Sequence, residues 1–311
     1  MLSPSDASSI GDEIAEFIRS HGIHFERGNP RQYFEQISHV SASLTLPLVP
    51  AERLRTVVLL KSFYSLWNIV VDDEMDRAEG TRHHLDSSIQ LLLRRSRGEP
   101  GALPGATAGA STLDAILSRL PQDAAKAPLR ELFYFDFWEL MTGFCFEYCI
   151  NKERWAANSE EYSKYSTVTA GIKHFFDLDC LFADQTLEPA TYRRMRLGYE
   201  QLGLAIKFAS DMGSLKRELV DEDNLNIIRI RAMESGMPGV ERKLESEAQY
   251  QAVLPTLQPL FEKTRQKAFE NLNTCRELLT GVQGIDTAPF LKAITAIIET
   301  YSKRDPFFRQ K

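Results

Sequence analysis

Residues Leu129–Ile150 read LRELFYFDFWELMTGFCFEYCI, and this stretch decides the fold class. Its apolar residues recur at spacings of three and four, which is the period of an α-helix. The stretch is also apolar on more than one face, so a helix formed by it must be surrounded by other helices. It therefore predicts a central helix in an all-α bundle, with other helices in an outer ring.

The rest of the chain continues the helical periodicity, and alternating stretches typical of strands are hard to find. Residues 98–112, GEPGALPGATAGAST, predict a surface loop, because glycine and proline cannot continue a helix. The pattern is equally apolar on both sides of that loop, so we expect a single domain over residues 1–311. The expected helices are 6–20, 31–45, 51–72, 84–96, 111–120, 127–151, 160–184, 190–218, 224–236, 241–248, 252–281 and 287–304.

Composition excludes several classes of protein. The chain has 311 residues, 37 basic and 43 acidic side chains, a net charge of −6 and a hydrophobic share of 43%. These values are ordinary for a folded protein and argue against disorder. A net negative charge provides no general field that would gather nucleic acid, so we expect no nucleic-acid partner. Any anion that the protein binds must be held locally.

The sequence also bears on location. The most apolar run, around Ile69–Val71, ends at Asp72 and is too short for a membrane span. The first residues, MLSPSDASSIGDEI, lack the basic flank and apolar run of a secretory signal. Cys145 and Cys149 are four residues apart, and no CxxC or Cys/His cluster completes a zinc site. We therefore expect a cytoplasmic protein with reduced cysteines.

Three carboxylates follow an apolar helix in the segment FYSLWNIVVDDEMDRAEG. Asp72 and Asp76 are four residues apart and share a helix face, with Asp73 beside them. Like charges at the negative end of a helix dipole repel one another, so something positive must compensate them. A metal ion would do so. The alternative is a solvated acidic helix end with Arg77 and Arg82 as counter-charges.

A second set of oxygen ligands lies in KFASDMGSLKRELVDEDNLNI. Ser210, Ser214 and Glu218 are spaced four residues apart and form a stripe along one helix face. Asp211 with Ser214 and Glu218 is nearly as well aligned. Hard cations such as Mg²⁺ take oxygen ligands of these kinds. The alternative is a chance pattern on an exposed face.

Together the two segments resemble a known family. DDEMD is similar to the DDxxD motif of class I terpene synthases, and SDMGSLKRE, about 140 residues later, is similar to their (N/D)DxxSxxxE motif. The chain length also resembles that of single-domain microbial members. The resemblance implies a helical bundle with a central active-site cavity. It further implies a Mg²⁺-dependent terpene cyclase, a carbon–oxygen lyase acting on phosphates, that converts farnesyl or geranylgeranyl diphosphate to a cyclic sesquiterpene or diterpene and releases diphosphate.

The resemblance assigns metal ligands residue by residue. Asp72, supported by Asp76 and with Asp73 in the same catalytic motif, falls on two Mg²⁺ ions. Ser210, Ser214 and Glu218 fall on a third, and Mn²⁺ is an alternative to Mg²⁺. Ser210 stands where the family usually has Asn or Asp, so either its hydroxyl binds the metal or the neighbouring Asp211 does.

Diphosphate contacts are implied in the same way. Arg217 matches a basic residue that contacts the diphosphate, and Arg304 matches the arginine of a C-terminal Arg-Tyr pair, although Asp305 replaces the tyrosine. The family's diphosphate-sensing arginine falls on Ser166. Lys164 and Lys173 are the candidates to replace it, although an ammonium group cannot offer the bidentate fork of a guanidinium group.

The last assignments concern the helix break and the cavity. The resemblance makes Thr169, Ala170 and Gly171 the linker and helix break. A carbocation must be shielded from water, and aromatic faces attract a cation without offering it a lone pair. The candidate cavity residues are the aromatic side chains Phe63, Trp67 and Phe144, for each of which ordinary core packing is the alternative.

Two other functions stay open. A chain-elongating prenyltransferase shares the first motif, but it normally carries a second DDxxD instead of the stripe of oxygen ligands. An inactive helical binding protein would explain Ser210 and the missing arginine at Ser166. The expected partner in the leading hypothesis is a prenyl diphosphate substrate, and a homodimer is the family expectation.

Overall fold

The structure is a computed structural model that describes residues 2–76, 80–99, 101 and 103–303. These described residues contain no β-strand, which confirms the all-α prediction. They divide into two compact units. Unit 1 comprises Met1–Met141, His174–Thr191 and Gly281–Phe290, and unit 2 comprises Thr142–Lys173, Tyr192–Thr280 and Leu291–Lys311. The single domain expected for residues 1–311 stays a prediction.

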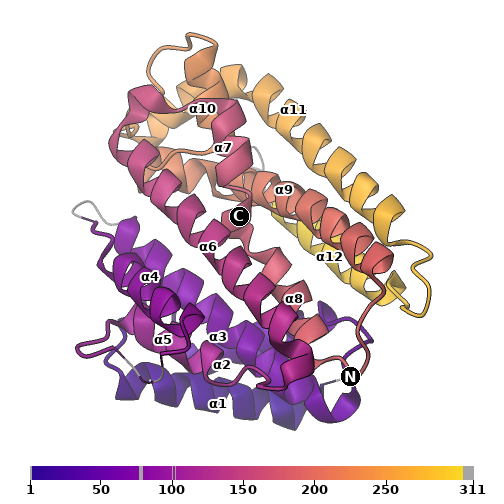
Figure 1. Cartoon of the computed structure of the whole chain (residues 1–311). Helices are drawn as coiled ribbons and strands as arrows, with labels where there is room; N and C mark the ends of the chain where they lie inside the picture. Colours follow the sequence, from indigo (N-terminus) through magenta and orange to yellow (C-terminus); the bar gives the residue numbers. More distant parts are fainter. Residues whose placement is uncertain (1, 77–79, 100, 102, 304–311) are drawn as a thin grey trace. The chain divides into compact units, whose positions relative to one another are not determined.

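Unit 1 holds the N-terminal helices, drawn in indigo and purple in Figure 1. Its elements are α1 (Pro4–Ser20), α2 (Pro30–Ser43), α3 (Ala51–Met75), α4 (His83–Ser96), α5 (Ala108–Leu117), the short 3₁₀ helix η1 (Ala124–Lys126), the first part of α6 (Ala127–Lys152) and most of α8 (Ile172–Phe182).

Local sequence explains the first two helices. The side chains of Ser3 and Asn29 accept backbone N–H groups at the starts of α1 and α2, and a proline follows each of them. This is the preferred order of residues at a helix N-terminus. A Cβ on Gly11 would lie only 2.6 Å from the carbonyl oxygen of Arg31. The glycine therefore lets α1 lie directly against α2 (Figure 1).

Helix α3 is the core helix of unit 1. It is long and apolar enough to cross a membrane by length and composition, but 72% of its most apolar window is buried inside the protein. Near its middle, Lys61 is completely buried and its Nζ lies 2.7 Å from Oδ1 of the equally buried Asp179 on α8. Lys61 also donates to the carbonyl of Leu44 and the hydroxyl of Thr45, and the Leu46 N–H donates to Asp179. This network joins the α2–α3 connection to two helices.

Unit 2 holds the remaining elements. They are the rest of α6, η2 (Arg154–Ala156), α7 (Ser159–Tyr165), η3 (Val168–Ala170), nearly all of α9 (Pro189–Val220), α10 (Ile227–Glu234), α11 (Glu247–Leu279) and most of α12 (Ala288–Lys303).

Three expectations about helix boundaries need correction. The loop expected at 98–112 is shorter, because Thr107 caps α5 and the helix begins at Ala108. The helix expected at 241–248 is absent, since Ser246 caps α11, which begins at Glu247. The helix expected at 160–184 is interrupted between α7 and α8. There Gly171 adopts a left-handed φ of 64°, a conformation that glycine tolerates without steric cost.

Candidate active site

The aspartate-rich segment ends α3 in unit 1. Arg27, from the α1–α2 connection, donates through Nη2 to Oδ1 of Asp73 at 2.5 Å and lies 3.7 Å from Oδ2 of Asp72. Burial alone would lower the pKa of Arg27, but its hydrogen bond to Asp73 and the two carboxylate charges raise it. Arg27 therefore supplies part of the positive charge that we expected at this helix end. Arg82, one of the two counter-charges expected from the sequence, pairs with Asp86 at 3.3 Å.

The carboxylates of this segment differ in what they contact. Glu74 accepts the hydroxyl of Thr81 and the backbone N–H of His84, so it holds the start of α4. Asp76 follows the last residue of α3, and its N–H donates to the carbonyl of Asp72. The Asp72 side chain is 42% exposed and is therefore accessible to a solute. Glu74 contacts the start of α4, whereas Asp72 is partly exposed beside Arg27, and its role as a metal ligand stays a prediction.

Ser210, Ser214 and Glu218 all lie on α9, in unit 2, and their spacing of four residues puts them on one helix face. Ser214 donates through its hydroxyl to the carbonyl of Ser210 at 2.9 Å. Glu218 accepts from Nδ2 of Asn226 at 2.8 Å. Asn226 also caps α10, because its Oδ1 accepts hydrogen bonds from the N–H groups of Ile228 and Arg229. One amide side chain therefore holds both the carboxylate and the next helix.

Glu218 lies in low-dielectric surroundings. Burial, and then the neighbouring charge of Asp211, raise the pKa of Glu218 to about 7, against the opposing effect of Lys207. A bound divalent cation would favour the charged carboxylate. Two serine hydroxyls and a carboxylate are oxygen donors of the kind that Mg²⁺ takes. The donor set of this helix face therefore fits the metal chemically.

Asp211 has a different environment from Ser210. It is buried, and its Oδ2 accepts the N–H of Ile227 at 2.9 Å, while its Oδ1 lies 3.4 Å from Nζ of Lys207. Burial raises the pKa of Asp211, and the charge of Lys207 opposes that rise. The carboxylate is committed to the start of α10 and to Lys207. Asp211 is thus engaged in other contacts, and whether Ser210 or Asp211 binds a metal stays a prediction.

The other predicted residues have varied environments. Arg217 is exposed and pairs with Glu222 at 2.6 Å. Lys173 is half-buried at the start of α8. Arg304, and with it the C-terminal pair, lies outside the described residues. In the described part of the chain, no three His, Cys, Asp or Glu side chains lie close enough together to hold a metal ion.

The helix break lies between α7 and α8. The Thr169 hydroxyl lies 2.7 Å from the carbonyl of Ser166 and 3.1 Å from Oε1 of Glu147 on α6, and its one proton is shared between them. Ala170 is the last residue of η3, directly before Gly171. The Ser166 side chain, where the resemblance expects an arginine, is completely buried. Sequence reasoning missed Glu147, which is 22 residues from Thr169 and has no motif around it.

The aromatic candidates are interior residues. Phe63 packs edge-on against Phe17 at 5.0 Å between ring centroids, with the Arg119 guanidinium over its ring at 5.2 Å. Trp67 donates through Nε1 to Ser88 at 3.0 Å. Both belong to the core of unit 1, and Phe144 is buried in unit 2. Their role as cavity walls stays a prediction.

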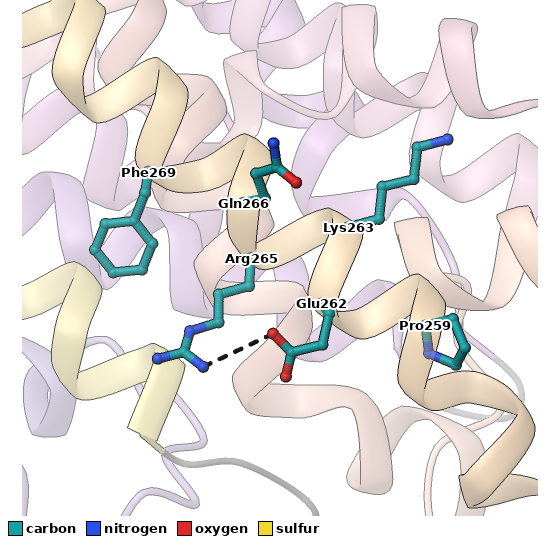
Figure 2. Close-up of a pocket in the computed structure, with 6 residues that line it drawn as sticks. All are labelled: Pro259, Glu262, Lys263, Arg265, Gln266 and Phe269. Carbon is teal, nitrogen blue, oxygen red and sulfur yellow. Dashed lines mark ion pairs between the residues drawn. The ribbon is translucent and has the colours of Figure 1, made fainter.

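Two hollows lie on the surface of unit 2, and neither contains a predicted site residue. The larger, of about 530 Å³, is lined by residues of α11 alone, with a Glu262–Arg265 ion pair at 3.8 Å (Figure 2). The smaller, of about 350 Å³, lies between the α10–α11 connection and the first turns of α11. Neither hollow is lined by a residue of the predicted metal or diphosphate set, so we assign no activity to either.

The described helices form an all-α fold that carries the two acidic motifs of the sequence, one at the end of α3 and one on α9. The chain belongs to terpene synthase family 2: the model of this family, described as C-terminal metal binding, matches residues 64–243, more than half of the 311 residues. The matched range contains both motifs. The prediction of the terpene synthase family is therefore confirmed, and membership implies an enzyme that acts on prenyl diphosphates.

Solved structures agree with the fold. Linalool/nerolidol synthase from Streptomyces clavuligerus, in complex with 2-fluorogeranyl diphosphate, is 12% identical with a TM-score of 0.64, over 96% of this chain and 97% of that one. For 2-methylisoborneol synthase from Streptomyces coelicolor A3(2), in complex with Mg²⁺ and geranyl-S-thiolodiphosphate, the identity is 13% and the TM-score 0.61, over 97% and 91%. Comparison with curated protein sequences gives no match.

Proposed function

We propose that the protein is a Mg²⁺-dependent terpene cyclase. It ionises farnesyl or geranylgeranyl diphosphate, releases diphosphate and closes the carbocation to a cyclic sesquiterpene or diterpene, as a carbon–oxygen lyase. The observation that carries this proposal is the face of α9 on which Ser210, Ser214 and Glu218 stand, with Glu218 held by Asn226 and Asp211 turned to other contacts. Family membership supports the substrate class.

Each residue has a proposed task. Asp72, with Asp73 and Asp76, holds two metal ions, and Ser210, Ser214 and Glu218 hold the third. Bound Mg²⁺ supplies positive charge that stabilises the departing diphosphate, and Mn²⁺ can replace it. Arg217, Lys173 and Arg304 donate hydrogen bonds to phosphate oxygens. The diphosphate contacts, the break at Thr169–Gly171 and the aromatic walls Phe63, Trp67 and Phe144 are proposed from the resemblance. The protein acts in the cytoplasm, as a homodimer.

Turnover with defined substrates tests this function. The purified chain is incubated with C10, C15 and C20 prenyl diphosphates, because the similar synthases are in complex with geranyl analogues. We expect diphosphate release and a cyclic hydrocarbon with C15 or C20 in the presence of Mg²⁺, and no release after EDTA treatment. Restoration by added Mg²⁺ is the control. Release that survives metal removal, or a longer prenyl diphosphate as the product, would contradict the proposal.

Ser210 provides a finer test of the metal assignment. Ser210→Asn introduces an amide oxygen and is expected to keep or lower the Mg²⁺ concentration needed for half-maximal turnover. Ser210→Ala removes the ligand and is expected to raise that concentration about tenfold. The measurement is a Mg²⁺ titration of diphosphate release. The matched control is Asp211→Asn, which is expected to lower the melting temperature and to have the smaller effect on the Mg²⁺ requirement. A larger effect of Asp211→Asn than of Ser210→Ala on the Mg²⁺ requirement would instead identify Asp211 as the metal ligand.

A further inference from the structure

The helix break of unit 2 packs against two glycines, one on α6 and one on α9. A Cβ on Gly143 would lie 2.5 Å from Cγ2 of Val168 and 2.7 Å from the carbonyl oxygen of Tyr165. A Cβ on Gly203 would lie 3.2 Å from the carbonyl oxygen of Thr167. The backbone of the break therefore approaches both helices closely where no side chain stands between them.

One helical turn beyond each glycine stands a charged residue. Glu147 follows Gly143 by four residues on α6, and Lys207 follows Gly203 by four residues on α9, so each charge shares a face with its glycine. Nζ of Lys207 lies 3.1 Å from Oε1 of Glu147, the oxygen that also accepts from the Thr169 hydroxyl.

Lys207 has contacts beyond Glu147. Its ammonium group lies 3.4 Å from Oδ1 of Asp211 and 5.3 Å from the centre of the Tyr162 ring, and its side chain is only 19% exposed. Burial would lower the pKa of Lys207, but the charges of Asp211 and Glu147 raise it well above its usual value, so the group stays charged. Lys207 is therefore paired with two carboxylates in partly buried surroundings, where an ion pair is less screened by water than on the surface.

These contacts connect two functional elements. Through Glu147, Lys207 reaches the break at Thr169. Through Asp211 it reaches the first N–H of α10, next to Asn226, which holds Glu218. The break and the Ser210–Glu218 face of α9 therefore share one charged network. At the position where the resemblance expects an arginine, this chain has the buried Ser166. The break is therefore linked to the α9 face through Glu147 and Lys207 and not through an arginine at position 166.

We propose that Glu147 and Lys207 are positioning residues whose ion pair fixes the helix break relative to the Ser210–Glu218 face, so that ligand binding at that face and the order of the break are coupled. This inference rests on the proposed function, because it takes the α9 face as the binding site for metal and diphosphate. Neither residue needs to touch the substrate for this role.

Hydrogen–deuterium exchange of residues 165–171 tests the coupling, with Mg²⁺ and inorganic diphosphate as probes on the full chain. Glu147→Gln keeps an acceptor for Thr169 but removes the charge that Lys207 pairs with. We expect exchange in 165–171 to rise about tenfold without ligand. In the wild type, Mg²⁺ plus diphosphate is expected to slow this exchange, and in Glu147→Gln the slowing is lost. Thr169→Val, a nearly isosteric change, is expected to act in the same direction.

The control is the double variant Lys61→Met/Asp179→Asn, which removes a buried pair in unit 1 and is expected to keep the ligand-induced slowing. If Glu147→Gln and Thr169→Val keep the wild-type response to the probes, the pair is merely structural and the inference is overturned. A wild type that releases diphosphate from a prenyl substrate but shows no response in 165–171 also overturns it, while the proposed function stands. A wild type that neither turns over any prenyl diphosphate nor binds the probes overturns both.

Discussion

Replacing Asp72 with alanine is expected to lower the rate of diphosphate release by at least about a hundredfold, because it removes a proposed metal ligand. The fold should survive. Asp72 is partly exposed, Arg27 keeps its closer contact with Asp73, and the change relieves repulsion between neighbouring carboxylates. The measurement is initial-rate diphosphate release at saturating substrate, together with the melting temperature.

The matched control lies in the same segment. Glu74→Gln also removes one negative charge, but it leaves an oxygen to accept the His84 N–H at the start of α4. Its turnover is expected to stay within about threefold of the wild type, since the observed contacts of Glu74 are hydrogen bonds to Thr81 and to the start of α4. Full activity of Asp72→Ala, or equal losses in the two variants, would contradict the assignment of the metal to Asp72.

The largest expected effect on stability comes from Lys61→Met. The substitution leaves Asp179 completely buried without its cation, and breaking such a pair costs about 3–5 kcal/mol of unfolding free energy. The surface variant Asp12→Asn, which removes the carboxylate charge paired with the exposed Arg31, is the control and should cost less than about 1 kcal/mol. Urea denaturation of the three proteins measures both losses.

The same variant predicts a pH dependence. Burial raises the pKa of Asp179 to about 6, and Lys61 opposes that rise. In Lys61→Met this opposition is gone, so the folded-state pKa rises further while the unfolded value stays near 3.9. The folded state then binds a proton that the unfolded chain does not, and stability rises as the pH falls. The stability lost relative to wild type should be smaller at pH 5 than at pH 8. Equal losses at both values would show that Asp179 does not take up a proton.

Patterns within one helix were predictable from the sequence. The apolar period of residues 129–150 predicted α6, and the spacing of Ser210, Ser214 and Glu218 placed them on one face of α9. The apolar pattern alone did not show the break at Gly171, because apolar residues keep their period on both sides of it; the break was expected only from the resemblance. A left-handed glycine interrupts a helix without changing that period.

Contacts between distant residues were not predictable in the same way. Arg27 meets Asp73 across 46 residues of sequence, and Lys207 meets Glu147 across 60. Each partner is an ordinary surface-type residue in its own segment, and only tertiary packing brings the two together. The contact between Asp211 and the start of α10 was likewise not visible in the sequence around Asp211.

Asn226 uses both ends of its amide, the oxygen for the N–H groups of α10 and the nitrogen for Glu218. Aspartate has the same shape and caps a helix equally well, but it has no nitrogen to donate. Exchange of this one amide for a carboxylate, as in Asn226→Asp, would therefore leave the helix content intact while setting a second carboxylate against Glu218. Such a protein would keep its circular dichroism spectrum and lose the arrangement of the acidic face.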